Sequence, residues 1–165
     1  MDKITPCLWF DGQAEQAAQF YTSLFPDSRI DAVHHSPAEN TSTPAGAVLT
    51  VDFTLAGQKY IGLNGGPDFK FNEAISLSID CEDQAEVDRY WDGLIAGGGE
   101  HSVCGWLKDR YGVSWQVIPK AIEKYFDGSD RAGAARAMEA MLQMTKIDVE
   151  KLREAYEGVP VGSAR

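Results

Sequence analysis

The stretch Gln13-Ala14-Glu15 opens an amphipathic segment that the chain uses twice. Over residues 13–24 its apolar positions recur at helical spacing. Gln84-Ala85-Glu86 opens a second such segment about 70 residues later. A short strand-like run, over residues 4–10 or 75–81, precedes each segment. Self-similarity at this distance predicts one supersecondary module that is present twice.

Each helical segment is followed by three further strand-like runs. In the first module they cover residues 29–36, 48–55 and 59–63, and in the second 100–104, 106–109 and 113–118. Turn residues such as Ala56-Gly57 and Tyr111-Gly112 separate neighbouring runs. Both halves therefore have the order strand, helix, strand, strand, strand. This order predicts an α+β fold of two βαβββ modules.

The pattern changes after Pro119, where helical periodicity replaces the strand-like runs. We expect helices over residues 120–125, 130–144 and 149–156, with Asp148 as the N-cap of the last one. The expected organisation is paired modules over residues 1–119, about 1–66 and 74–119, and a C-terminal helical tail over 120–165 in the same domain. Met138, Met141 and Met144 give this tail an apolar stripe, which suits a core or a dimer contact.

Charge and hydropathy exclude several classes of partner. The formal net charge is −10 and the isoelectric point is about 4.7. Nucleic acids and anionic membranes both require a positive surface, so neither is an expected partner. No apolar run approaches the roughly 18 residues that span a bilayer, and the first residues lack the pattern of a signal peptide. We therefore expect a cytoplasmic location.

Three cysteines, Cys7, Cys81 and Cys104, occur without a CxxC pair. This spacing disfavours both a zinc ribbon and a disulfide framework. Cys7 and Cys81 fall within strand-like runs, where a buried thiol is the simplest interpretation. A nucleophilic Cys7 would need a neighbouring cation to lower its pKa, and the sequence places no basic residue beside it.

Several motifs across the chain carry a family resemblance. They are Phe10-Asp11-Gly12-Gln13-Ala14-Glu15, Ser76-Leu77-Ser78-Ile79, Cys104-Gly105-Trp106-Leu107-Lys108-Asp109, the segment Gly112-Val113-Ser114-Trp115-Gln116-Val117-Ile118-Pro119, and Met144-Thr145-Lys146-Ile147-Asp148. The chain resembles the PhnB-like branch of the vicinal oxygen chelate superfamily, which includes glyoxalase I and the bleomycin-resistance proteins. Members of this branch are often labelled demethylubiquinone methyltransferase-like. The resemblance implies a cupped sheet from each module, a small-molecule site in the cup and a homodimer.

The superfamily's enzymes hold a divalent metal through His, Glu or Gln side chains on the first and last strands of the modules. In this chain these positions fall at Thr5, at Ser76, at Gln116, and at Ile61 or Leu63. Gln116 alone has a side chain of the superfamily's ligand types. The three histidines lie elsewhere, and neighbouring His34 and His35 point to opposite faces of a strand. We therefore expect no native metal ion and no other cofactor.

Alternation along the strands predicts which side chains face the cup. The candidate ligand-binding residues are Thr5, Cys7, Trp9, Ser76, Ser78, Trp106, Ser114 and Gln116. A few polar groups among aromatic walls are typical of a small-ligand pocket. Two alternatives remain open at this point: a half-solvated sheet face, and a face covered by a partner subunit.

Three functions compete, and the residues leave open whether any reaction is catalysed. The first is a small-molecule binding protein without a native metal. The second is a metal-dependent enzyme of the lyase or dioxygenase type, which would depend on Gln116. The third, a methyltransferase, is disfavoured because no glycine-rich loop joins a strand to a helix ahead of an acidic ribose-binding residue. Gly97-Gly98-Gly99 follows a helix and ends it.

Overall fold

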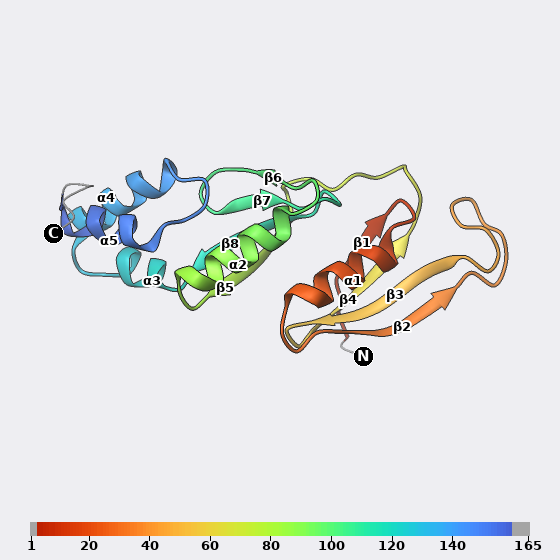
Figure 1. The fold of residues 1–165 in the computed structure, drawn as a ribbon. Coiled ribbons are helices and arrows are strands. Elements are labelled where there is room, and N and C mark those ends of the chain that lie inside the picture. The colour runs from red at the N-terminus through yellow and green to blue at the C-terminus, as the bar shows by residue number, and fades with distance from the viewer. Residues whose placement is uncertain (1–2, 160–165) are drawn as a thin grey trace. The chain divides into compact units, whose positions relative to one another are not determined.

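The computed structural model describes residues 3–159. The chain divides into two compact units, Met1–Phe71 and Asn72–Arg165, and each unit has a four-stranded sheet of its own (Figure 1). The expected pairing of the two modules within one domain stays a prediction. No helix within residues 3–159 is long and apolar enough to cross a membrane.

The first unit has the predicted βαβββ order. Its elements are β1 (Cys7–Phe10), α1 (Ala14–Leu24), β2 (Arg29–His35), β3 (Val48–Leu55) and β4 (Gln58–Asn64). The strands lie in the order β1-β4-β3-β2, with β1 parallel to β4 and the other neighbours antiparallel. Helix α1 covers one face of this sheet (Figure 1). Buried residues of β1 and β3, such as Phe10 and Phe53, form the core with buried Tyr21 of α1.

The second unit repeats this topology. Its elements are β5 (Leu77–Cys81), α2 (Gln84–Ile95), β6 (Glu100–His101), β7 (Trp106–Lys108) and β8 (Ser114–Pro119), in the sheet order β5-β8-β7-β6. In both sheets the first strand of the module is followed by its fourth, third and second strands. The predicted duplication is therefore confirmed. Asp83 accepts a hydrogen bond from the Glu86 N–H at 2.9 Å and thereby caps α2. The Glu86 carboxylate reaches back to the Glu82 N–H at 3.0 Å.

The tail forms three helices, α3 (Ala121–Phe126), α4 (Arg131–Leu142) and α5 (Val149–Glu157). They enclose a small core of their own, in which the buried residues are Tyr125, Ala137, Ile147 and Leu152. Met141 and Met144 pack against this core, whereas Met138 is 41% exposed. The predicted methionine stripe is therefore divided between the core and the surface.

Hydrogen bonds fasten the tail to the second module. The Gln84 side chain accepts from the Val149 N–H at 2.8 Å and donates to the Ile147 carbonyl at 3.1 Å. The N–H groups of Cys104 and Gly105 donate to the carbonyls of residues 144 and 145 at 2.8 Å each. The tail is thus an integral part of the second unit.

Some expected strands are shorter than the sequence suggests. The first strands of the modules begin at Cys7 and Leu77, so Thr5 and Ser76 lie just ahead of them. The strand expected over residues 100–104 ends at His101. Cys104 and Gly105 have φ angles of 56° and 79°, which no strand allows. Their N–H groups bond to the tail instead, and the tail thereby overrides the local β propensity.

Candidate functional site

Each sheet has a helix-distal face, which is the face turned away from α1 or α2. On β1, buried Leu8 and Phe10 alternate with exposed Cys7 and half-buried Trp9. On β8, buried Trp115 and Val117 alternate with half-buried Gln116. Side chains on the helix-distal face do not belong to the helix-packed core. Alternation therefore places these strand residues on the helix-distal faces, and their part in ligand binding stays a prediction.

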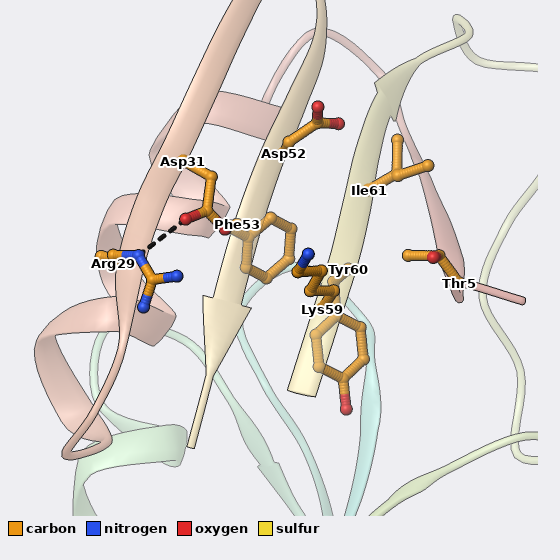
Figure 2. A pocket seen from close by; sticks show the side chains of 8 residues that line it. All are labelled: Thr5, Arg29, Asp31, Asp52, Phe53, Lys59, Tyr60 and Ile61. Atoms are coloured by element: carbon orange, nitrogen blue, oxygen red, sulfur yellow. Dashed lines mark ion pairs between the residues drawn. The ribbon is translucent and has the colours of Figure 1, made fainter. Parts of the chain in front are cut away.

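The first unit has a pocket of about 250 Å³, which Figure 2 shows. Strands β2, β3 and β4 and the segment before β1 supply its lining, which consists of Thr5, Arg29, Asp31, Asp52, Phe53, Lys59, Tyr60 and Ile61. Thr5 was predicted at the site from the sequence. The other seven were not proposed as ligand-binding residues. Two of them could have been found from the sequence. Alternation over residues 48–55 and 58–64 puts Asp52 and Lys59 on the same face of the sheet as Cys7.

Both carboxylates of this pocket are already engaged. Asp31 pairs with the Arg29 Nε at 2.7 Å (Figure 2) and accepts from the Thr54 hydroxyl at 2.6 Å. Asp52 lies 3.1 Å from the His34 Nε2. The Lys59 ammonium has no ion pair among residues 3–159. An unpaired cation among engaged carboxylates is the group of this pocket that can still accept an anionic partner.

The Thr5 hydroxyl lacks a partner as well. Its Oγ1 is buried and makes no hydrogen bond within the described part of the chain. A buried hydroxyl without a partner costs about 1–3 kcal/mol. A turn of roughly 120° in χ1 moves the hydroxyl of a threonine to the position that its methyl group held, which is one way for the hydroxyl to reach an occupant of the pocket that Thr5 lines.

The second unit has a smaller pocket of about 120 Å³. Two predicted residues, Trp106 and Ser114, line it together with Glu73, Glu100, His101, Ser102, Leu107 and Lys108. Lys108 forms an ion pair with Glu73, which raises the pKa of Lys108 and lowers that of Glu73. Ser114 is 2% exposed, and its Oγ is the other buried side-chain oxygen of residues 3–159 without a hydrogen-bond partner.

A hydrogen bond fixes the tautomer of His101 in this pocket. The Trp91 indole N–H donates to the His101 Nδ1 at 3.2 Å. Since an indole N–H can only donate, Nδ1 must be the unprotonated nitrogen of a neutral ring. The proton of such a ring sits on Nε2, and the contact with Trp91 holds His101 against α2.

The remaining predicted residues have other surroundings. Gln116 donates through Nε2 to the Ser76 hydroxyl at 2.9 Å and pairs in register with Ser78, so these three lie together beside Trp106. Trp9 donates its indole N–H to the Gly66 carbonyl at 2.9 Å and meets the Phe69 ring edge-on at 4.9 Å. Trp9 thus holds the segment after β4 in place.

Cys7 lies on the helix-distal face without an activating contact. Desolvation raises the pKa of its thiol. A raised pKa lowers the thiolate fraction and so disfavours nucleophilic attack. Cys81 is fully buried, and burial is the largest cause that raises its pKa to about 12.

The residues at the superfamily's ligand positions do not fit a divalent ion. The two modules are related by the sequence offset that takes Gln13 to Gln84, and the same offset takes Cys7 to Ser78. In the sheets Cys7 pairs with Ile61, and Ser78 pairs with Gln116. Ile61, rather than Leu63, is therefore the counterpart of Gln116, and it carries no donor atom. Over residues 3–159 no group of three or more His, Cys, Asp or Glu side chains could hold a metal ion together.

The family model described as 3-demethylubiquinone-9 3-methyltransferase matches residues 2–118. The chain belongs to this family. The prediction of a PhnB-like member of the vicinal oxygen chelate superfamily is thereby confirmed. The family description by itself does not establish a methyltransferase activity for this chain. No curated protein matches the chain.

The chain is also similar to several solved structures. The PhnB protein from Bacillus cereus is 36% identical, with a TM-score of 0.64, over 72% of this chain and 99% of that chain. A protein from Pseudomonas aeruginosa is 19% identical, with a TM-score of 0.59, over 72% of this chain and 98% of that chain, and shares the fold. A glyoxylase/bleomycin resistance protein/dioxygenase domain from Frankia is 12% identical, with a TM-score of 0.43, over 72% of this chain and 92% of that chain.

Proposed function

We propose that this PhnB-like protein binds small organic molecules on the helix-distal faces of its sheets, without a native metal ion. One observation carries the proposal. The two buried side-chain oxygens of residues 3–159 that lack a hydrogen-bond partner, on Thr5 and Ser114, each belong to a residue that lines a pocket. Each such group in a native protein calls for an explanation. A ligand that forms a hydrogen bond with each hydroxyl would be such an explanation.

The surroundings of the two hydroxyls support the proposal. Ligand pockets combine apolar walls with a few convergent polar groups, and both pockets have this composition. On the helix-distal faces, Ile61 accompanies Thr5 in the first pocket, and Trp106 accompanies Ser114 in the second.

Near-isosteric variants test this function. Thr5→Val and Ser114→Ala remove the unpartnered hydroxyls and change little else. Because nothing in the unliganded protein pairs with these groups, both variants should be as stable as the wild type or more stable. Ligands found by thermal-shift screening of the wild type should bind at least one variant about 5–10-fold more weakly, which is the value of one lost hydrogen bond.

Thr22→Val is the matched control. The Thr22 hydroxyl donates to the Ala18 carbonyl at 2.8 Å on α1, away from either pocket, so ligand affinity should not change. Destabilised Thr5 and Ser114 variants with unaltered ligand affinity would show that the hydroxyls are structural. A stoichiometric metal ion in the purified protein, with binding or turnover lost on Gln116→Ala, would favour the metal-dependent enzyme instead.

We also propose that the protein is a homodimer, as the family resemblance implies. Helix α4 leaves Met138 41% and Leu142 54% exposed, which offers apolar area for a second copy. Sedimentation velocity should give a dimer for the wild type and a monomer for Leu142→Glu. A monomeric wild type would refute this assembly.

A further inference from the structure

The charges of the first pocket are arranged unequally. Two cations, Arg29 and Lys59, and two carboxylates, Asp31 and Asp52, line it, so their formal charges cancel. Asp31 already has an ion-pair partner in Arg29, and Asp52 already has a hydrogen-bond partner in His34, whereas Lys59 has no ion-pair partner within residues 3–159. A cationic ligand would share each carboxylate with its existing partner. An anionic ligand meets a cation that is free.

Apolar surface lies next to this cation. Ile61 lies on the same face of the sheet as Lys59 and lines the pocket (Figure 2), whereas the Phe53 and Tyr60 rings, with centroids 5.5 Å apart, lie on the helix-packed side of the sheet. Partial burial raises the pKa of Tyr60, so this phenol stays neutral and adds no competing negative charge. With a volume of about 250 Å³ the pocket suits a ligand smaller than a drug-sized molecule.

We propose that the first pocket binds a small amphipathic organic anion. Its carboxylate or similar head group pairs with the Lys59 ammonium, and the Thr5 hydroxyl donates a second hydrogen bond to the same head group. Its apolar body, of about one ring, lies against the Ile61 side chain. This assignment rests on the proposed function and names the ligand class for one of its two pockets.

Three probes with a common benzyl body separate the possibilities. Phenylacetate is the anion, phenylacetamide the neutral analogue and phenethylamine the cation. Titration into ¹⁵N-labelled protein reports affinity from amide shifts and locates the binding site. Phenylacetate should bind most tightly and shift the amides of Thr5, Lys59 and Ile61, and its affinity should fall as salt is added.

Lysine variants test the assigned contact. Lys59→Met keeps the apolar stem, removes the charge, and should weaken phenylacetate binding about tenfold or more while leaving phenylacetamide unchanged. Lys59→Arg keeps the charge and should retain most of the affinity. Lys70→Met is the control, because Lys70 is exposed in the same unit and does not line the pocket. The ¹⁵N spectrum of each variant shows directly that it is folded.

The outcomes separate this assignment from the proposed function. Tighter binding of the amide or the amine than of the acid would overturn the anion class and leave a binding pocket in place. Phenylacetate shifts confined to the second unit, or equal losses in Lys59→Met and Lys70→Met, would overturn the pocket assignment. Absence of binding by all three probes would also overturn it, and the proposed function would then depend on the thermal-shift screen alone.

Discussion

Replacement of Asn64 by alanine should destabilise the first unit by about 2–4 kcal/mol. Asn64 ends β4 and is 6% exposed. Its Oδ1 accepts from the Ala14 N–H at 2.9 Å, and its Nδ2 donates to the Val48 carbonyl at 2.9 Å. Ala14 is the first residue of α1, and the residue before it, Gln13, makes no side-chain cap. Asn64 therefore caps the helix from a strand 50 residues away.

The magnitude follows from the groups that the substitution leaves behind. The Ala14 N–H would stay buried without a partner, at a cost of about 1–3 kcal/mol. The Val48 carbonyl is only part-buried, so its lost bond should cost about 0.5–1.5 kcal/mol. The two contributions sum to about 1.5–4.5 kcal/mol, and the stated range is the middle of that interval, a large share of a small unit's stability.

Urea denaturation followed by far-ultraviolet circular dichroism, which reports the loss of helix, measures the change. Asn72→Ala is the matched control, because Asn72 is exposed and its Oδ1 accepts only from the Ala74 N–H at 2.9 Å in a local turn. The control should change stability by less than about 0.5 kcal/mol. Equal effects of the two substitutions would refute the argument that a distant side chain caps α1.

Three further predictions concern the second unit. Gly105→Ala should lower the free energy of unfolding by well over 1 kcal/mol, because φ is +79° and a Cβ would lie 2.8 Å from the Ile147 Cδ1. Gly112→Ala is the control: φ is +87° and the space around it is open, so its loss of stability in the same urea titration should be clearly smaller. The pKa of the Cys81 thiol is raised to about 12 in the folded protein, so above pH 9 the thiol ionises more readily in the unfolded chain. The free energy of unfolding should therefore fall as the pH rises, by up to about 1.4 kcal/mol per pH unit. A Cys81→Ala variant with the same pH slope as the wild type would contradict this. Removal of the chain after Pro119 should uncover apolar surface around Ile118 and cause aggregation, and light scattering that finds an unchanged soluble species would count against it.

Several elements of the structure follow from local signals in the sequence. Asp83 and Asp148 each accept from the N–H three residues on, at 2.9 and 3.0 Å, so a short pattern suffices to locate the start of α2 and α5. Alternation along the strands assigned Cys7 and Gln116 to helix-distal faces, since successive side chains of a strand point to opposite sides.

Parts of the candidate site depended on contacts between distant segments. Trp9 looked like a ligand-facing aromatic residue, but its indole is held by Gly66 and Phe69, which no spacing near β1 reveals. Lys59 acquires its importance only when β3 and β4 pair, because their register places Lys59 opposite Thr54 and one pair along from Asp52 on the same face of the sheet. The sequence shows which residues are charged, but it does not show which of their side chains pair with one another in the fold.

The amino-acid sequence alone determined the duplicated βαβββ module, the α+β class and the family, because these depend on periodicity and motifs within short windows of the chain. Tertiary structure decided where the strands end, what caps α1, and which hydroxyls and which lysine lack partners. The physical reason is that a hydrogen bond or an ion pair is satisfied by whatever the fold brings within about 3 Å. Proximity of that kind, as between Ala14 and Asn64, is fixed by strand register and helix packing across dozens of residues.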